Sequence, residues 1–563
     1  MKKHLCCILL IFVTHNFVNG SQLRERVYLQ TDKHLYLAGE PILIKLLTTG
    51  SDLIPLTFSK IAYVELVNET IAQIQIKVEL TNGTGTGQIL LPADLPTGYY
   101  RLIAYTQFMR NESVDVFFEK NIAVLNTFQS GYQFAETEQE DTEYHFSSVQ
   151  DSNNNTFSLQ PDKTTYMPRT RGELILSGLP ENIHTLSLTI AGKDILPVTE
   201  SDASLLRKNL TKQSTEFSGD FLPEYEGHIV TGKITDNQTG MTGSDGASYI
   251  TGLAFLADNG IRFFAGQNYG TGNVRFFTSG ISGTNEIATA IYNTGERYRV
   301  DILSPFVNRY APKQMPELRI DSAYYDQALA RSVALQVFRY FSENRFENQN
   351  IPEPYFKIEP AWSYPLDEYT RFTTMREVFI EFITGARFRR NATNGKQELQ
   401  IFVTSSNRNA YGIMPLVLLD GVPITDHDII YNYDPLSVEQ INIYNGPFIM
   451  GGYPFDGIVE LLTYRRLHQD LSLNKSTQIL TYEGPQLPYR FNTPDYSEEK
   501  NRISRMPDTR HTLLWNPDVQ TDGKTSIRLP FDTSDLAGEF QVTVEGITKD
   551  GEIIFATAFF KVE

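Results

Sequence analysis

The residues of this sequence best suited to chemistry are its histidines, seven of which follow the first twenty residues. A catalytic or structural metal site needs such side chains at short fixed spacings, as in His-Glu-x-x-His. No two of them stand at such a spacing, and the sequence has no Gly-x-Ser-x-Gly segment and no phosphate-binding loop with its lysine. We therefore expect no catalytic residue, no metal centre and no cofactor. The seven are His34, His145, His184, His228, His427, His468 and His511.

Two acidic clusters carry the oxygen ligands that calcium accepts in proteins. In the first cluster, oxygen-bearing residues occupy alternate positions from residue 151, and another stands at the twelfth place of an EF-hand loop that would begin there. Thr156, however, stands where that loop requires glycine. The second is the turn Asp426-His427-Asp428. Solvated turns explain both clusters more simply, and calcium stays an alternative at each. The first cluster consists of Asp151, Asn153, Asn155 and Asp162.

The composition is that of a folded, acidic chain. Of its 563 residues 41% are hydrophobic and 21% charged, and this length implies several domains because single cores stop growing near ~250 residues. The net charge of −18 argues against nucleic acid as a partner and against direct attraction to anionic lipid.

The first twenty residues are typical of a secretory signal. Lys2 and Lys3 precede an apolar run, and small residues follow at a cleavage site. Both cysteines, Cys6 and Cys7, lie inside this signal, so the mature chain would have no thiol. No later stretch has the ~18 apolar residues of a membrane helix. We expect an exported protein whose mature chain is soluble or peripheral to a membrane.

The elements that must position any site are clearest between Pro415 and Arg466. The apolar run 416–419 ends at Asp420-Gly421, a dipeptide suited to a turn with both residues at positive φ. A second strand alternates through Ile441 and Ile443, and Gly446-Pro447 is expected to end it. A third strand is predicted over 458–464, entered through Gly451-Gly452 and Asp456-Gly457.

A helix precedes these strands. Thr374 and Glu377 have the spacing of a capping box, and the apolar residues that follow fall on one helical stripe that ends at Gly385. The whole unit is therefore predicted to be one capped helix followed by three short strands, and we assign residues 371–466 to it.

The rest of the chain is predicted to be mainly β. A pattern of Leu-Gln, Asp-Lys, Tyr and Gly-Glu occurs between Leu29 and Glu40 and again between Leu159 and Glu173, which indicates a repeated domain. The expected divisions are a β-sandwich over 21–126, a linker over 127–154, a second sandwich over 155–222, a third over 226–305, a helical spacer over 306–370 with a helix at 321–343, an extended arm over 467–507, and a terminal β-domain over 508–563.

Several of these segments resemble known families. The sequences TTMREVF, PLVLLDGVPI, VEQINIYNGP and FDGIVELLTY resemble the plug domain of TonB-dependent receptors of Bacteroidetes-type bacteria. The first, second and terminal β-domains resemble macroglobulin domains, the first being similar to the MG2 type. GHIVTGKITDNQTG resembles the opening of a carboxypeptidase-regulatory-like sandwich. The fold class expected is mainly β, with tandem macroglobulin or Ig-like sandwiches and a smaller plug-like α/β part.

The resemblance implies a binding function. Receptor plugs occupy a barrel of many strands of about ten residues each, and the residues after Arg466 are too few to form one. The thioester trap of macroglobulins needs a cysteine that the mature chain lacks. The resemblance implies a non-enzymatic module of the cell envelope, periplasmic or associated with the outer membrane, with surface exposure left open. It would dock on or gate an outer-membrane barrel formed by another chain, in transport or secretion. The alternative is a surface adhesin that binds glycan or protein.

The docking residues predicted from the plug-like motifs lie at turns and glycine-rich corners. They are Asp420, Gly421, Asn445, Gly446, Pro447, Gly451, Gly452, Phe455, Asp456 and Gly457.

Overall fold

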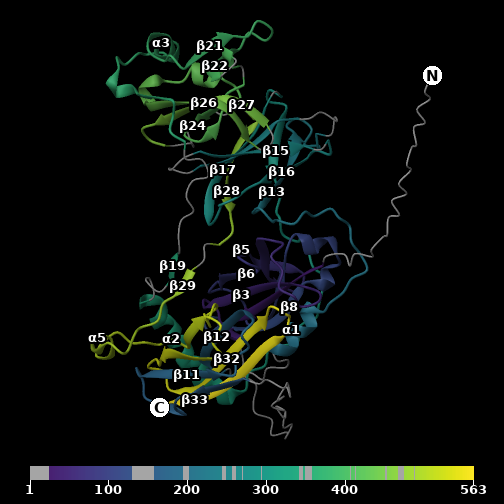
Figure 1. Ribbon diagram of the computed structural model, residues 1–563, viewed down its shortest axis with the longest axis vertical. Coiled ribbons are helices and arrows are strands. Elements are labelled where there is room, and N and C mark those ends of the chain that lie inside the picture. Colours follow the sequence, from purple (N-terminus) through teal and green to yellow (C-terminus); the bar gives the residue numbers. More distant parts are fainter. Residues whose placement is uncertain are drawn as a thin grey trace, which may run out of the picture.

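The computed structural model describes residues 24–129, 157–193, 202–243, 249–256, 261–268, 270–292, 294–341, 346–348, 358–405, 408–412, 414–450, 453–466, 475–486 and 489–563. The described chain is mainly β, with several sandwich sheets and a smaller α/β part, which confirms the fold class predicted from sequence. Figure 1 shows two sandwiches at one end of the long axis and two further domains at the other.

The first domain is a sandwich of two mostly antiparallel sheets, ordered β1-β3-β6 and β2-β8-β7-β4-β5. Its inward side chains, such as Leu29, Ile44 and Leu102, are wholly buried in one core. Two short 3-10 helices, η1 (Phe108–Asn111) and η2 (Val114–Val116), precede the last strand. The strands are β1 (Glu25–Thr31), β2 (Leu35–Leu37), β3 (Pro41–Gly50), β4 (Ile61–Asn68), β5 (Ile71–Glu79), β6 (Thr84–Leu90), β7 (Gly98–Tyr105) and β8 (Phe118–Leu125).

The second sandwich is built from two distant parts of the chain. Its sheets are ordered β9-β11-β31 and β10-β33-β32-β12-β30, which is the order of the first domain strand for strand. Four strands come before the inserted residues and four after them. They are β9 (Ser158–Pro161), β10 (Thr165–Tyr166), β11 (Arg171–Ser177) and β12 (Ile183–Gly192), then β30 (Thr512–Asn516), β31 (Ser526–Asp532), β32 (Gly538–Thr548) and β33 (Ile553–Val562).

This split corrects the predicted division into separate domains over 155–222 and 508–563. Strand β12 lies between β30 and β32, so neither half can close a sandwich alone. The insertion stands between the fourth and fifth strands, where the first domain has only the turn Glu69-Thr70. Its two ends meet, because the Gly192 N–H donates to the His511 carbonyl at 2.9 Å. A chain read in order gives no sign of this, because strand partners need not be sequence neighbours.

The sequence repeat has a structural counterpart in both sandwiches. The Tyr36 hydroxyl donates to Asp32 Oδ1 at 2.8 Å, and the Tyr166 hydroxyl donates to Asp162 Oδ1 at 2.7 Å. Each carboxylate also accepts a backbone N–H from the next strand, from Leu43 in the first copy and from Glu173 in the second. The repeated residues therefore fix the same strand-to-strand connection twice.

Replacing either tyrosine with phenylalanine is expected to lower the free energy of unfolding of its own sandwich. The loss should be about 1–2 kcal/mol for Tyr36, whose partner Asp32 is buried, and about 0.5–1 kcal/mol for Tyr166, whose partner Asp162 is exposed. Urea denaturation of Tyr36→Phe and Tyr166→Phe checks this. Phenylalanine at the exposed Tyr225 is the control, with no expected change. Unchanged stability in both sandwiches would show that the hydroxyls are not structural.

The chain returns to the first sandwich after β12. Helix α1 (Asp202–Leu210) packs Leu206 and Leu210 into the first domain's core, and Asp202 forms an ion pair with Lys120 at 2.7 Å. The sequence prediction placed the segment up to residue 222 in the second sandwich. In the structure this segment covers the first sandwich instead.

Helix α2 (Tyr325–Phe341), preceded by the 3-10 turn η3 (Ser322–Tyr324), also packs on the first domain. Ala328 and Leu335 lie against Leu35 and Leu125, whereas Val333 on the other face is 53% exposed. The helix predicted at 321–343 is thus present but buries one stripe rather than most of its circumference. Among the described residues, no helix has the length and apolar character required to span a membrane.

The third sandwich is one folded seven-stranded sheet, ordered β18-β13-β16-β15-β14-β17-β28. Val300 at one end and Tyr482 at the other share a core. Its last strand comes from the segment predicted as an extended arm, which also supplies β29 (Tyr489–Phe491), paired with β19 (Phe346–Asn348), and α5 (Glu499–Arg502). The strands are β13 (Ile229–Asp236), β14 (Thr251–Leu256), β15 (Arg262–Asn268), β16 (Asn273–Phe277), β17 (Thr284–Ile291), β18 (Tyr298–Ile302) and β28 (Thr477–Glu483).

The α/β domain contains the predicted helix and three strands, together with a second sheet. Its sheets are ordered β20-β26-β27-β24-β25 and β21-β22-β23. The Thr374 hydroxyl accepts the Glu377 N–H, which confirms Thr374 as the N-cap; the Glu377 carboxylate accepts the Thr374 hydroxyl and not the backbone N–H that a full capping box would use. The elements are β20 (Trp362–Pro365), η4 (Leu366–Glu368), α3 (Met375–Glu381), β21 (Ala386–Arg390), β22 (Gln397–Ser405), β23 (Arg408–Gly412), β24 (Leu416–Leu419), β25 (Val422–Pro423), α4 (Asp428–Tyr431), η5 (Pro435–Ser437), β26 (Val438–Met450) and β27 (Tyr453–Thr463).

Two details of this domain differ from the prediction. The domain begins at β20, before residue 371, because Trp362 to Pro365 pair with β26. Strand β26 also continues past Gly446-Pro447 instead of ending there. The register shifts between Asn445 and Phe448, and such a bulge tolerates a proline that has no N–H to give.

Candidate functional site

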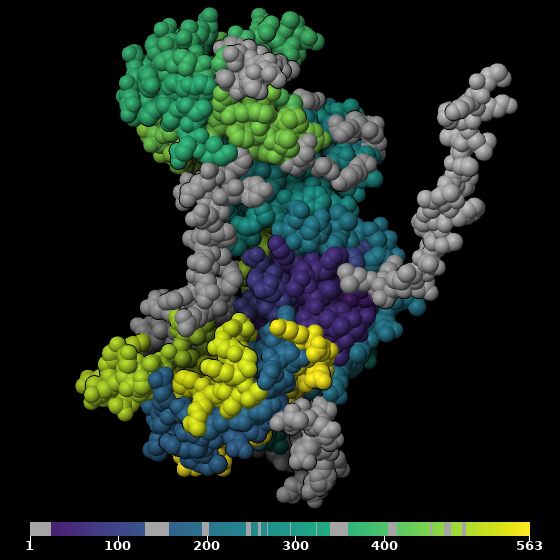
Figure 2. Space-filling model, in the orientation of Figure 1, coloured from purple at the N-terminus to yellow at the C-terminus, as the bar shows by residue number. Residues whose placement is uncertain are grey.

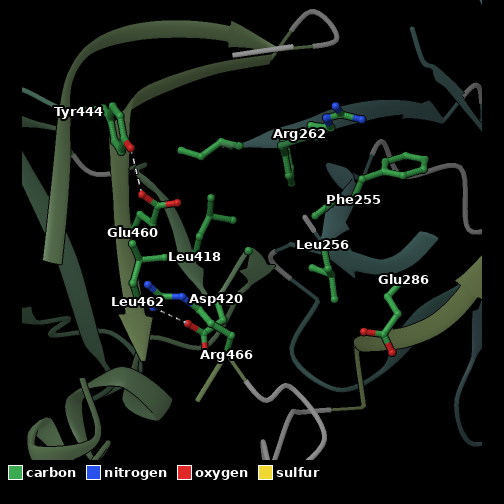
Figure 3. Close-up of a pocket in the computed structure, with 14 residues that line it drawn as sticks. Phe255, Leu256, Arg262, Glu286, Leu418, Asp420, Tyr444, Glu460, Leu462 and Arg466 are labelled. Carbon is green, nitrogen blue, oxygen red and sulfur yellow. Dashed lines mark hydrogen bonds and ion pairs between the residues drawn. The ribbon is translucent and has the colours of Figure 1, made fainter. Parts of the chain in front are cut away.

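A cleft of about 430 Å³ lies between the third sandwich and the α/β domain (Figure 3). One wall is the outer face of the sheet formed by β24, β26 and β27, and the other is formed by β14, β15 and the start of β17. Below the cleft the two domains share one hydrophobic core, in which Phe263 lies beside Phe455. The cleft is therefore a feature of two domains that fold together.

Strand alternation decides which side chains face the cleft. Leu418 pairs with Glu460 in the parallel register of β24 and β27, and both line the cleft. Their neighbours Val417 and Val459 point to the other face and are wholly buried. Both faces of these strands are covered, which explains the continuous apolar run recognised in the sequence.

Asp420 ties the turn after β24 to the end of β27. Asp420 and Gly421 have φ of 49° and 83°, which confirms the predicted turn. The Asp420 carboxylate accepts the Thr463 N–H at 2.7 Å and the Thr463 hydroxyl at 2.6 Å. Arg466 lies 3.7 Å away. Both oxygens of Asp420 are thus used inside the protein, and its role is structural.

Glu460 lies deeper in the cleft and is only 8% exposed. Its Oε2 accepts a hydrogen bond from Asn442 Nδ2 at 3.0 Å. It accepts another from the Tyr444 hydroxyl at 2.9 Å, which Figure 3 shows as a dashed line. Burial, with the nearby Glu460 charge, raises the pKa of Tyr444, so this hydroxyl stays protonated and remains a donor. Sequence reasoning missed Glu460, because a single acidic residue within an apolar strand was its only signal.

The opposite wall carries Arg262 and Glu286 beside Phe255 and Leu256. Burial lowers the pKa of Arg262, and its Nη1 donates to the Gly280 carbonyl at 3.3 Å. The cleft therefore has charges of both signs on facing walls, with apolar side chains between them.

The residues predicted to dock on a partner do not form one exposed surface, and this part of the site prediction needs correction. Phe455 is 1% exposed because it packs against the third sandwich. Gly457 is buried so tightly that a Cβ there would lie 2.5 Å from Ile401 Cδ1. Asp420 is buried as described, and Asp456 accepts the Met414 N–H at 3.1 Å.

The remaining predicted docking residues are scattered. Gly421 lies at the cleft, where a Cβ would contact Leu256 at 3.4 Å. Asn445 and Gly446 are half-buried at the bulge of β26, and Pro447 alone is exposed. Gly451 and Gly452 lie outside the described residues.

A different part of the α/β domain is exposed and basic. Strand β21 is an edge of its sheet and carries Arg387, Arg389 and Arg390, all exposed. In an antiparallel pair, alternate residues of a strand bond to the neighbouring strand, and the Phe402 N–H donates to the Gly385 carbonyl. The backbone N–H and C=O groups of Phe388 and Arg390 therefore point away from β22. Figure 1 shows β21 at the end of the molecule opposite the first and second sandwiches.

His228 belongs to a buried polar network and not to a reaction centre. Its Nδ1 lies 2.8 Å from Glu224, and its Nε2 lies 2.5 Å from the Tyr482 hydroxyl. Glu224 also accepts from the Tyr63 hydroxyl at 3.0 Å. His228 is 2% exposed, so a substrate has no access to it. The network joins the first sandwich to the third.

The carboxylates considered for calcium hold protein groups. Asp426 pairs with Lys396, and Asp428 accepts the Gln397 N–H at 2.9 Å. Asp162 accepts from Tyr166 and Glu173, whereas Asp151 to Asn155 lie outside the described residues. No group of three metal-ligating side chains was found in the described part of the chain.

His427 is expected to make the α/β domain sensitive to acid. Burial lowers its pKa from the ordinary 6.5 to about 4, and its Nδ1 accepts the Leu399 N–H at 2.9 Å, a bond that protonation would break. A lowered pKa contributes stability above pH 6.5 that is lost as the pH falls toward 4. Thermal unfolding of the wild type and His427→Gln between pH 7 and 4 checks this. Equal pH slopes in the two proteins would contradict it.

No protein-family model matches this sequence, and no curated protein matches it. Among solved structures, the chain is similar to methylamine-reacted α2-macroglobulin of Salmonella, at 10% identity over 96% of this chain and 39% of that one, with a TM-score of 0.22. Native E. coli α2-macroglobulin is 11% identical over 96% of this chain and 40% of that one, with a TM-score of 0.23. The E. coli adhesin FdeC is 9% identical over 49% of this chain and 64% of that one, with a TM-score of 0.14.

This chain spans about two fifths of the length of the macroglobulins that it matches. TM-scores near 0.2 are too low to support an argument about function.

Proposed function

We propose that this protein is a non-catalytic envelope module that docks on a separate outer-membrane β-barrel through its α/β domain. The observation that carries the proposal is the placement of that domain. It is inserted, together with the third sandwich, into the second of two repeated sandwiches and lies at the far end of the molecule (Figure 1). The resemblance of its sequence to receptor plugs supplies the barrel as the class of partner.

The docking surface on this proposal is the β21 edge and not the glycine-rich corners. Figure 2 shows the α/β domain as the upper end of the molecule, beyond the third sandwich. Three exposed arginines on one strand stand out in a chain of net charge −18, so an acidic surface on the partner would be complementary.

Charge reversal tests docking better than deletion of 371–466. Such a deletion would leave Phe263 and Ala254 of the third sandwich without their packing partners. The double variant Arg389→Glu/Arg390→Glu changes exposed side chains only. Arg505→Glu, an exposed arginine near the second sandwich, is the matched control.

Pull-down from cross-linked envelopes is the measurement. The wild type and Arg505→Glu should recover a barrel protein, and Arg389→Glu/Arg390→Glu should reduce its recovery at least about tenfold, since reversed charges repel where they attracted. Equal recovery by all three, or recovery of no barrel protein, would refute the docking function.

The second candidate is an adhesin or a glycan- or protein-binding protein on the outer surface. The cleft between the third sandwich and the α/β domain favours it, because a concave site with a few polar groups is typical of ligand binding. Protease treatment of intact cells separates the two candidates. Cleavage supports the surface function, and protection supports the periplasmic one.

A further inference from the structure

One oxygen of Glu460 is left for a ligand. Oε2 accepts two hydrogen bonds from the protein, whereas Oε1 accepts none from the described part of the chain. Figure 3 shows this second oxygen toward the open middle of the cleft. The side chain as a whole is 8% exposed, but Oε1 itself is open to the cleft and not sealed in the interior. A carboxylate oxygen without a protein donor is stabilised when a ligand supplies one.

The cations of the cleft are placed elsewhere. The Arg466 Nη2 lies 2.9 Å from Glu439, and its Nη1 donates to the Thr463 carbonyl. Arg262 lies on the opposite wall, where it donates to the Gly280 carbonyl. No ion pair in the described chain joins Glu460 to a lysine or an arginine. Glu460 therefore has no positively charged partner within the described chain, and a cationic ligand would supply one.

The shape and lining of the cleft limit the kind of cation. Its volume of about 430 Å³ lies in the range of small-molecule sites. Leu256, Leu418 and Leu462 line it beside Glu460, which suits an aliphatic stem better than a hydrated metal ion. Asn442 and Tyr444 hold the carboxylate in one orientation, so little freedom is lost when a donor binds.

We propose that this cleft binds the ammonium or guanidinium end of an aliphatic chain, as on a lysine or arginine side chain. Glu460 Oε1 accepts the charged N–H donors, and Leu418 and Leu462 pack against the stem. The site is separate from the docking surface on β21, so it stands or falls independently of the proposed function.

Calorimetric titration of the full chain with agmatine and cadaverine tests this proposal, with hexanoate as the probe of opposite charge. Both cations should bind with saturation and hexanoate should not. Glu460→Gln should weaken cation binding by about 10–100-fold, the factor expected for loss of a charge-assisted hydrogen bond. Glu381→Gln, an exposed carboxylate on α3, should bind as the wild type does.

A second variant covers the case in which Glu460→Gln does not fold. Leu462 is half-buried in the cleft wall, and Leu462→Trp narrows the cleft without changing its charge, so it should abolish binding of both cations. Absence of saturable cation binding by the wild type, equal binding by Glu460→Gln, or hexanoate binding as tight as that of the cations would each overturn the proposal.

Discussion

Removal of residues 508–563 is expected to unfold strands β9 to β12 as well as the strands deleted. Strand β12 would lose β30 on one side and β32 on the other, and β11 would lose β31. Leu186, Leu188 and Ile190, now wholly buried, would face water. The four remaining strands, with half a core, cannot offset the free energy lost when these side chains are exposed, because the stability of a whole domain is only about 5–15 kcal/mol.

Hydrogen exchange measured by mass spectrometry checks this expectation. Peptides from 158–192 should exchange at the rate of unfolded chain in the truncated protein and slowly in the full one. Peptides from β1 to β8 are the internal control and should keep most of their protection, because the core of the first sandwich comes mainly from its own strands, with Ile547 as its buried member from the deleted residues. Retained protection over 158–192 would show that those residues fold without the terminal strands.

The second large effect is expected at Asp508. Arg510 is 1% exposed, and its guanidinium donates to Asp508 at 2.6 Å and to the Leu513 carbonyl at 2.8 Å. Asp508→Ala leaves this charge buried without its counter-ion, which costs about 3–5 kcal/mol of unfolding free energy. Urea denaturation monitored on the second sandwich is the measurement.

Two further variants make the result specific. Asp508→Ala/Arg510→Met removes both charges and should recover most of the lost stability, since apolar groups of similar size often replace a buried pair without loss. Glu498→Ala breaks the exposed pair with Lys500 and should change stability by less than about 0.5 kcal/mol. A loss at Asp508 no larger than that at Glu498 would contradict the buried-pair account.

Features set by neighbouring residues were predictable from the sequence. The turn at Asp420-Gly421, the helix N-cap at Thr374, and the repeated tyrosine-aspartate pair each depend on a few residues close in sequence. Their physical causes, positive φ, an N-cap and a local hydrogen bond, act within the same segment. The structure therefore has them where the sequence indicates.

Features set by distant partners were not predictable. The halves of the second sandwich and the strand β28 find their sheets across long stretches of chain, and no local pattern states which strand lies beside which. The site shows the same limit. Phe455 has the sequence setting of an exposed corner, yet the third sandwich covers it, whereas Glu460 gains its role only from the wall opposite.

The central claim is that the inserted domains interrupt one sandwich, so that strands on either side of the insertion are neighbours. Ser526 is exposed and Ser177 is half-buried; the two stand opposite each other in β11 and β31, and their hydroxyl oxygens lie 3.3 Å apart. The only cysteines of the sequence are Cys6 and Cys7, so a chain that begins at residue 24 has no other thiol.

Disulfide formation in Ser177→Cys/Ser526→Cys is the most direct test, with Gln73→Cys/Ser177→Cys as the control pair from different sandwiches. Paired positions across two strands meet the geometry that a disulfide requires. We predict nearly complete oxidation of the first pair and free thiols in the second, measured by mass spectrometry of unreduced peptides. Free thiols in Ser177→Cys/Ser526→Cys would contradict the split sandwich.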